Sequence, residues 1–201
     1  MPIRLIRSDN KSPTIILFYR ASCIFSNFYP AKFGIEINGN MMNFDCSEQF
    51  FMYQKALSAG DNDSAERILK MTKPLLMKRA GRKLKMDQEM LKRWSEMSSE
   101  VMERGIYAKF QQNEDLLVDL LRTRGMLLAE ASPRDKVWGI GLGVNNKLSE
   151  HPKSWKGSNK LGNILGKIRD DLWEKTEFRT IREIIEKEDV SKRCEKLEKL
   201  G

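Results

Sequence analysis

The apolar residues of this chain come in short runs, and this limits the folds that it can adopt. The longest runs, such as TIILFY at residues 14–19, are far shorter than the roughly 20 residues that a membrane-spanning helix needs. A compact chain of 201 residues can bury roughly 70% of its unfolded surface, which is enough for a self-sufficient core. We therefore expect one folded domain with an appendage, and no membrane partner.

The numbers and positions of the cysteines and the histidine indicate the cellular compartment and limit the kinds of metal site that the chain can form. The three cysteines are odd in number and unevenly spaced: Cys23, Cys46 and Cys194. This pattern favours a reducing compartment, and Arg4 and Arg7 interrupt the only apolar run that a secretory signal could use. We expect the protein in the cytoplasm, and a nuclear location also fits. With His151 as the single histidine and no close cysteine pair, we expect neither a metal nor a cofactor.

Periodicity and turn residues predict an α+β fold in which helices predominate and strands are few and short. Strands are expected at residues 14–19, 32–37, 41–44, 126–131 and 137–142, with a hairpin turn at 38–40. Helices are expected at 47–59, capped by Asp45 or Ser47, and at 63–71, 74–82, 88–111, 113–123 and 159–173. Residues 1–12 resemble a polar lead-in. The predicted organisation is a lead-in at 1–17, a domain at 18–173 and a charged helical tail at 174–201.

The net charge of +8 lies entirely outside that tail, because residues 174–201 hold eight basic and eight acidic side chains. Residues 70–93 hold nine basic side chains against two acids, and residues 147–169 hold six against one. Such stretches are most often solvated surface. They also suit a phosphorylated ligand or a nucleic-acid backbone. Charge alone does not choose between these interpretations.

One predicted helix carries a candidate pair of catalytic groups. Glu48 and Lys55 lie seven residues apart, so they share one helical face, with Phe51 and Met52 between them. They can be a surface ion pair above core residues. Alternatively, Glu48 is a partly buried acid whose pKa is tuned by apolar surroundings and a basic neighbour.

A second group of candidates follows the strand expected at 126–131. Glu130 and Asp135 flank a Ser-Pro turn, where acids are often caps but also reach clefts. Trp138 and Trp155 are either core plugs or stacking platforms for a planar base. The glycines in GIGLG at 139–143 are better explained by a turn or a close approach of the backbone than by a phosphate-binding loop.

Nine short motifs, in this order, resemble the NADAR family of YbiA-like N-glycosidases over about residues 18–172. They are SNFYP at 26–30, CSEQF at 46–50, QKA at 54–56, GR at 81–82, KF at 109–110 with Asn113, LLRT at 120–123, LAEASPRD at 128–135, WGIGL at 138–142 and WKGSNKLG at 155–162. Two departures stand out: Gln49 replaces the usual histidine, and Arg124 interrupts the usual Thr-Gly pair.

The resemblance implies an α+β domain that cleaves N-glycosidic bonds without a metal. One branch of the family hydrolyses phosphorylated ribosylaminopyrimidine intermediates of riboflavin biosynthesis to ribose 5-phosphate and a free base. Another branch removes ADP-ribose from guanine in nucleic acid. The expected partner is thus a small phosphorylated ribosyl compound, with ADP-ribosylated nucleic acid as the alternative. A non-catalytic module that binds ADP-ribose or a nucleotide is the alternative from another class.

The resemblance also supplies the candidate site residues. Cleavage of a ribosyl C–N bond builds positive charge on the sugar and needs a nearby carboxylate and a positioned water. The proposed catalytic residues are Glu48, Lys55, Glu130 and Asp135, with Glu48 as first choice. The proposed substrate-binding residues are Asn27, Phe28, Arg82, Lys109, Trp138, Gly139, Trp155 and Asn159; Arg82 and Lys109 are expected on phosphate.

Overall fold

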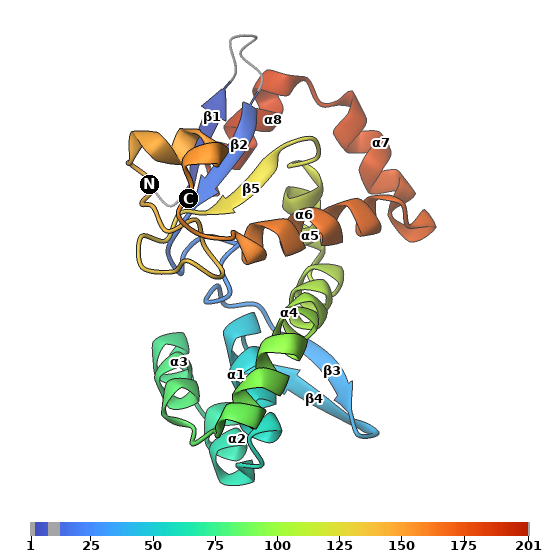
Figure 1. Ribbon diagram of the computed structural model, residues 1–201. Coiled ribbons are helices and arrows are strands. Elements are labelled where there is room, and N and C mark those ends of the chain that lie inside the picture. The colour runs from blue at the N-terminus through green and yellow to red at the C-terminus, as the bar shows by residue number, and fades with distance from the viewer. Residues whose placement is uncertain (1–2, 8–12, 201) are drawn as a thin grey trace. The chain divides into compact units, whose positions relative to one another are not determined.

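The computed structural model describes residues 3–7 and 13–200 of the chain (Figure 1). The chain forms two compact units: residues 27–113 form one, and the described residues of 1–26 and 114–201 form the other. Helices predominate over a few short strands, which confirms the α+β class. Among the described residues, no helix combines the length and apolarity that crossing a membrane requires.

The unit at 27–113 begins with a β-hairpin. Strands β3 (Phe33–Ile37) and β4 (Asn40–Phe44) pair antiparallel, with Phe33 opposite Phe44. Asn38 and Gly39 join them with φ angles of 51° and 77°, in the left-handed region that Asn and Gly tolerate best. The predicted hairpin is therefore confirmed.

Four helices complete this unit: α1 (Ser47–Ser58), α2 (Asn62–Leu69), α3 (Pro74–Lys83) and α4 (Gln88–Gln111). The ring of Phe50 on α1 lies edge-on to Phe44, with 5.1 Å between the ring centroids. On α4, a Cβ at Gly105 would lie 2.5 Å from Phe50 Cδ1, so this glycine allows the two helices to pack closely. α4 runs through Gly105 without a break.

The start of α1 differs from the expected cap. The N-cap residue is Cys46, and its side chain makes no capping hydrogen bond. Instead, the Gln49 side-chain oxygen accepts a hydrogen bond from the Asp45 N–H at 2.7 Å. The prediction that Asp45 or Ser47 caps the helix was therefore wrong. The N-cap position belongs to Cys46, and the side-chain hydrogen bond at the helix start is made by Gln49.

The other unit contains a three-stranded sheet in the order β1 (Ile3–Arg7), β2 (Pro13–Phe18) and β5 (Leu127–Glu130). β1 pairs antiparallel with β2, and β2 pairs parallel with β5 from Ile15–Leu127 to Phe18–Glu130. β1 lies where the sequence analysis predicts a polar lead-in without a strand. Within β1, Ile3 is buried and belongs to the apolar core. Residues 1–2 and 8–12 of that predicted lead-in lie outside the described residues.

Helices and a long irregular segment surround this sheet. The helices are α5 (Glu114–Leu121) and α6 (Lys160–Trp173), and the short 3₁₀ turns are η1 (Lys147–Glu150) and η2 (Pro152–Ser154). Residues 137–142 are not the predicted strand. The backbone of this stretch bonds instead to residues 156–161 and to the Glu130 carbonyl, and Gly141 turns it with a φ of 68°.

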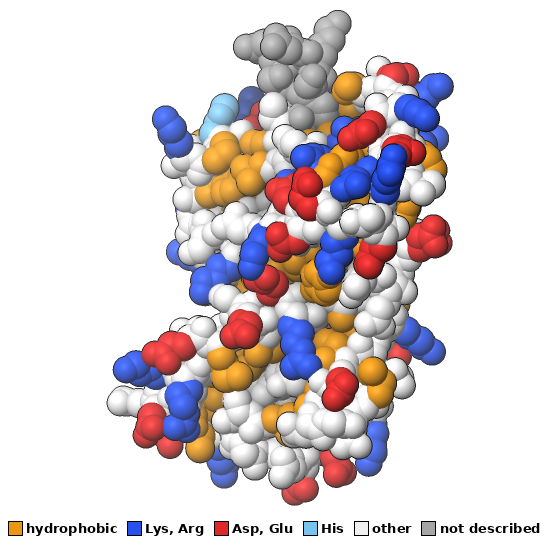
Figure 2. All heavy atoms as spheres, turned by 90° about the vertical axis from the view of Figure 1, so that its right-hand side faces the viewer, with side chains coloured by type: hydrophobic (Ala, Val, Ile, Leu, Met, Phe, Trp, Pro, Cys, Tyr) orange, Lys and Arg blue, Asp and Glu red, His pale blue; other side chains and the backbone are white. Residues whose placement is uncertain are grey.

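The tail folds as η3 (Thr176–Phe178), α7 (Arg179–Lys187) and α8 (Val190–Glu198). Its apolar side chains Ile185, Cys194 and Leu197 are buried. Figure 2 views the molecule from the side where α7 lies in Figure 1, and basic and acidic side chains lie interspersed there. The helical tail that the sequence predicts is thus present and packed.

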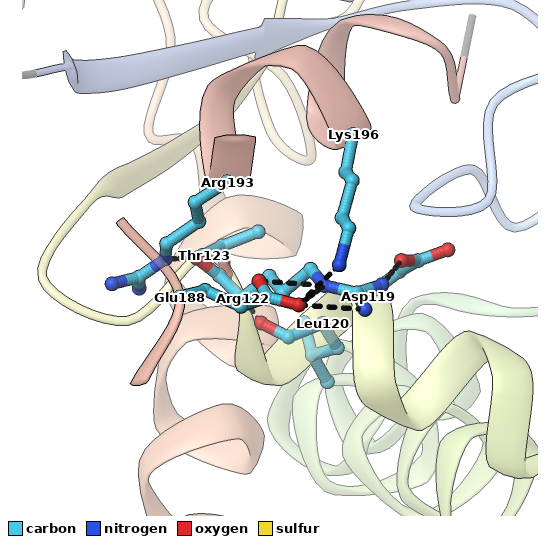
Figure 3. Close-up of polar contacts among 7 residues, drawn as sticks. All are labelled: Asp119, Leu120, Arg122, Thr123, Glu188, Arg193 and Lys196. Atoms are coloured by element: carbon cyan, nitrogen blue, oxygen red, sulfur yellow. Dashed lines mark hydrogen bonds and ion pairs between the residues drawn. The ribbon is translucent and has the colours of Figure 1, made fainter. Parts of the chain in front are cut away.

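Ionic contacts join the tail to the end of α5 (Figure 3). Arg122 contacts Asp119 and donates to both carboxylate oxygens of Glu188 at 3.1–3.3 Å. Lys196 contacts the same Glu188, and Arg193 donates to the Arg122 carbonyl. These partly buried ion pairs are also hydrogen-bonded. They therefore stabilise the packing of the tail more than exposed ion pairs would.

Candidate functional site

The first turn of α1 places a carboxylate in the interior of the 27–113 unit. Glu48 is only 3% exposed, although it belongs to a residue type that is almost never buried without compensation. Its backbone N–H donates to the Asn27 carbonyl at 3.0 Å, so the segment that contains Asn27 holds the helix start. Asn27 is itself buried, and its side-chain amide donates to Met102 Sδ at 3.2 Å.

Cys46 lies beside this carboxylate and reports the charges around it. The pKa of the Cys46 thiol is raised to about 11, mainly by burial, and the negative charge of Glu48 contributes in the same direction. The positive charge of Lys109 acts on the same thiol in the opposite direction. A buried thiol with so high a pKa stays protonated near neutral pH and is a poor nucleophile.

Lys109, which the sequence analysis proposes as a phosphate ligand, is buried. Its side chain is 1% exposed, and its Nζ lies 5.4 Å from the centroid of the Tyr29 ring and 5.1 Å from that of Phe110. Aromatic faces attract an ammonium group in such positions. The sequence prediction did not include Tyr29, although it is part of the SNFYP motif.

Lys55 lies near the other end of α1, on the face that Glu48 shares by its seven-residue spacing. Its Nζ donates to the Gly81 carbonyl at 2.9 Å, in the last turn of α3. Burial lowers the pKa of Lys55 below its ordinary value of 10.5, and the positive charge of Arg82 lowers it further. A lysine that gives up its proton more easily is a better nucleophile.

Arg82 and Phe28 are also in this unit and are more accessible than Glu48. Arg82 is exposed, so its guanidinium can meet a ligand anion. Phe28 is half-buried, and Lys78 Nζ lies 5.7 Å from the centroid of its ring. The structure therefore collects five of the predicted residues, together with Lys109, in one unit: Asn27, Phe28, Glu48, Lys55 and Arg82.

Gln49 stands where the family usually has histidine, and its side chain forms hydrogen bonds with backbone groups. Its Nε2 donates to the carbonyls of Ile68, Leu69 and Met71 at 3.1–3.2 Å, while its oxygen accepts from Asp45. The side chain is 1% exposed. Gln49 thus fastens the start of α1 to the end of α2.

The other unit contains the remaining candidates, and Asn159 is its most constrained one. Its side chain accepts from the Glu130 N–H at 3.1 Å and donates to the Leu128 carbonyl at 2.8 Å, as a neighbouring strand would. It precedes α6 with a φ of 50° and is 2% exposed. These bonds hold the edge of β5 next to the start of α6.

Asp135 and Gly139 shape the segment after β5. Asp135 Oδ1 accepts from the N–H groups of Val137 and Trp138 at 3.0 and 2.8 Å, which is a turn-forming arrangement. A Cβ at Gly139 would lie 2.7 Å from the Glu130 carbonyl oxygen, so close backbone approach requires glycine there. The Glu130 carbonyl in turn accepts from Ile140 N at 2.9 Å.

The two tryptophans occupy different surroundings. Trp155 packs against the apolar cluster that contains Leu17, Ala129 and Ile140, and its ring N–H donates to the Ser149 carbonyl at 3.0 Å. Those contacts fit the core-plug interpretation of Trp155. Trp138 is half-buried, and its backbone carbonyl accepts from Leu161 N at 3.0 Å.

Sequence reasoning missed several residues that build these surroundings. Cys46 is buried two residues before Glu48, and Arg169 donates from α6 to the carbonyls of Thr123 and Met126 at 3.0 and 2.7 Å. Arg169 is 7% exposed, and the match to the family motifs ends near it. Among the described residues, no group of three His, Cys, Asp or Glu side chains is close enough to hold a metal ion.

An α+β fold with a buried glutamate and a lysine of lowered pKa on one helix is typical of enzymes that use acid–base or nucleophilic catalysis. The NADAR domain matches residues 17–173. The chain belongs to the NADAR family.

Named relatives agree with this membership. Protein irg-1 of Caenorhabditis elegans is 47% identical over 208 residues, which cover 98% of each chain. N-glycosidase YbiA of Escherichia coli is 32% identical over 176 residues, or 86% of this chain and 98% of that protein. The NMR structure of E. coli YbiA has a TM-score of 0.61 and 30% identity over 79% of this chain and 84% of that chain. A maize protein, riboflavin biosynthesis protein PYRR, chloroplastic, is 31% identical over 79% of this chain, which spans 25% of the maize protein.

Proposed function

We propose that this NADAR-family hydrolase of N-glycosyl bonds cleaves the ribosyl C–N bond of phosphorylated ribosylaminopyrimidine intermediates of riboflavin biosynthesis. The products are ribose 5-phosphate and a free base. The observation that carries the proposal is a buried Glu48 that shares a helical face with a lysine of lowered pKa. The name of the related maize protein supports riboflavin chemistry as the source of the substrate.

Glu48 supplies the negative charge that the reaction needs. As the C1′–N bond lengthens, positive charge spreads over C1′ and the ring oxygen, and a carboxylate in a water-poor site stabilises it. The same carboxylate takes a proton from the attacking water, whose oxygen bonds to C1′. The departing nitrogen carries away the bonding electron pair and accepts a proton, so the products are the sugar phosphate and the amine.

Lys55 offers a second route to the same products. A neutral Nζ can attack C1′ of the ring-opened sugar and expel the amine, which leaves an imine that water then hydrolyses. Burial and the charge of Arg82 both favour the neutral form of Lys55. Reduction with borohydride during turnover distinguishes the routes: a stable adduct on Lys55 supports the imine, and no adduct supports direct attack by water.

Substrate binding is assigned more broadly. Arg82 is exposed and can bind a phosphate with its planar fork. Phe28 is half-buried and presents an aromatic surface on which a base can stack. For the other unit, we propose substrate contacts at Glu130, Asp135 and Trp138, and shape-maintaining roles at Gly139, Trp155 and Asn159.

The test is a turnover assay on a ribosylaminopyrimidine phosphate. We expect release of ribose 5-phosphate by the wild-type protein and a large loss in Glu48→Gln. Absence of turnover by folded wild-type protein would refute this substrate class.

The alternative substrate, ADP-ribosylated guanine in nucleic acid, is favoured by one surface feature. A hollow of about 590 Å³ in the 27–113 unit is lined by Asp61, Ser64 and three cations, Arg67, Lys83 and Lys85. Lys83 and Lys85 belong to the strongly basic stretch at 70–93, and a hollow with three cations suits the phosphates of a larger ligand.

A parallel assay on an ADP-ribosylated oligonucleotide tests this alternative. The alternative would be favoured if the double variant Lys83→Gln/Lys85→Gln turns over the oligonucleotide more slowly than the wild type does. Its turnover of the ribosylaminopyrimidine phosphate should then be unchanged. A matched control is Lys32→Gln, an exposed lysine on the same unit that does not line the hollow.

A further inference from the structure

A hollow of about 370 Å³ lies beside the carboxyl ends of the parallel strands β2 and β5. β2 ends at Phe18 and β5 at Glu130, and the Ala131 N–H donates to the Phe18 carbonyl at 2.8 Å, so both strands end at the same edge. In open sheets with parallel strands, ligands bind outside the carboxyl ends of the strands. The hollow is lined by residues that follow these two strands and by the loop at 143–146, among them Tyr19, Arg20, Pro133, Val144, Asn145 and Asn146.

Hydrogen bonds hold this loop in place as one wall of the hollow. Arg4 Nη1 donates to the Val144 carbonyl at 3.2 Å, which ties the loop to β1. The Gly143 carbonyl accepts from the Asn146 N–H at 2.9 Å and from the hydroxyl of buried Ser149 at 2.8 Å. The wall is therefore formed without a ligand, as in most small-molecule sites.

Aromatic, cationic and amide groups line the hollow, and none of its described lining residues is acidic. Tyr19 is 38% exposed, and Arg20 and Asn145 are exposed as well. A guanidinium binds phosphate with parallel hydrogen bonds, and a phenol ring stacks on a planar base. An amide both donates to and accepts from the edge of a base. The volume lies near the lower end of the roughly 300–1,000 Å³ of small-molecule sites, which favours a mononucleotide over a dinucleotide.

The backbone of Arg20 is a second, independent observation at the same hollow. Its φ of 86° lies in the left-handed region, which glycine adopts without strain and most other residues avoid. Among the described residues, the other non-glycine positions with positive φ are Asn38 and Asn159, and asparagine tolerates this conformation. Strained residues of this kind cluster at ligand sites, where the side chain is needed. The strain at Arg20 therefore indicates that its guanidinium has a function.

We infer that this hollow binds a nucleoside monophosphate. Arg20 binds the phosphate, Tyr19 stacks on the base, and Asn145 forms hydrogen bonds with the edge of the base. The inference goes beyond the proposed function, because it assigns binding and no chemical step to this hollow and needs no turnover at Glu48.

Calorimetry with AMP and adenosine tests the phosphate contact. We expect the wild type to bind AMP at least about tenfold more tightly than adenosine, because hydrogen bonds between charged groups are strong. Arg20→Gly should abolish this preference and leave adenosine binding unchanged. Arg179→Gln, at an exposed arginine of the same unit outside the hollow, is the control and should bind AMP as the wild type does. No AMP binding by the folded wild type, or an unchanged preference for AMP in Arg20→Gly, would overturn the inference.

A melting curve separates ligand binding from a structural role of Arg20. Glycine relieves the backbone strain, so Arg20→Gly should melt about 2–4 °C above the wild type while it binds AMP more weakly. A lower melting temperature with unchanged AMP binding would make Arg20 a structural residue and contradict the inference.

Two further variants test the base contact and the location of the site. Tyr19→Leu should weaken AMP binding by about tenfold, whereas Tyr19→Phe keeps the ring and should bind normally. Equal AMP affinities in these two variants would overturn the inference. Glu48→Gln should bind AMP as the wild type does. A loss of AMP binding in Glu48→Gln as large as that in Arg20→Gly would place AMP at Glu48 and overturn the inference. If the wild type does not turn over the ribosylaminopyrimidine phosphate, the proposed function fails, and AMP binding still decides this inference.

Discussion

The two units use their polar side chains in opposite ways. In the 27–113 unit, Glu48 and Lys109 are buried charges, and Lys55 is a half-buried one. In the other unit, Asn159 and Asp135 bond to backbone N–H and carbonyl groups and so substitute for regular secondary structure. A charge that is removed from water is available for chemistry, whereas an amide that bonds to two backbone groups fixes shape. We therefore expect substitution of Glu48 to change the rate and substitution of Asn159 to change the stability.

The largest effect is expected from Glu48→Gln. The amide keeps the volume but removes the charge, so turnover should fall by ~10²-fold or more while the substrate still binds. Steady-state kinetics and a melting curve on the same protein measure the two quantities. The control is Glu36→Gln, an exposed glutamate on β3, which should change neither. Near-normal turnover by well-folded Glu48→Gln would move the catalytic assignment to Glu130 or Asp135.

Asn159→Ala should show the reverse pattern. It removes the bonds to the Leu128 carbonyl and the Glu130 N–H, and leaving buried backbone groups unpaired costs about 3 kcal/mol for the two together. Denaturant unfolding measures this loss, and kcat per folded molecule should change far less than in Glu48→Gln. Asn163→Ala is the matched control, because its amide makes one exposed contact of 3.4 Å. Unchanged stability in Asn159→Ala would show that shape in this unit does not depend on that amide.

Two glycines on α6 sharpen the same point. A Cβ at Gly162 would lie 2.0 Å from the Leu128 carbonyl oxygen, so Gly162→Ala must push α6 away from β5 and should cost about 2 kcal/mol. At Gly166 the nearest atom would be Arg169 Nη2 at 3.8 Å, and alanine there should stabilise the helix by about 0.5 kcal/mol. Thermal unfolding of both variants checks the difference in sign. Equal effects would mean that α6 is not fitted tightly against β5.

The smallest effect concerns pH and Lys55. The fold lowers the pKa of Lys55 below 10.5, so the unfolded chain holds this proton more tightly. Between the folded pKa and 10.5 the unfolded state binds more protons, and this site therefore adds stability as the pH rises through that range. Lys55→Met should lose this rise in urea unfolding across that range, whereas Lys32→Met, at an exposed lysine, should keep it. The same slope in both variants would contradict the burial of Lys55.

The parts of the fold that the sequence predicted are those with local causes. Asn38 and Gly39 suffice for the hairpin, and Pro74 marks the first residue of α3. Residues 137–142 have the composition of a strand, but their hydrogen bonds go to a loop distant in sequence, which no local pattern encodes. The same limit explains β1, whose five residues, IRLIR, become a strand by pairing with β2.

The sequence could predict which residues belong to the candidate site, but it could not predict what each of them does. Residue types and the family motifs singled out Glu48, Lys55 and Lys109. The burial of Lys109 depends on α4 packing against α1 through Gly105 and Phe50, a contact between residues far apart in the chain. The backbone bonds of Gln49 likewise depend on where α2 ends. Long-range packing therefore decides what each polar side chain can do.

The unit that joins both ends of the chain also has a consequence for how the protein is made. Residues 27–113 leave the ribosome as one uninterrupted stretch and can collapse during synthesis. Strand β1 is synthesised long before β5 of the same sheet and before α8, which packs against β1 and whose Glu198 bonds to Arg7. Strand β1 must therefore wait for α8 before its packing is complete. A ribosome that stalls within α7 would display a finished 27–113 unit, while the sheet of the other unit would still lack α8.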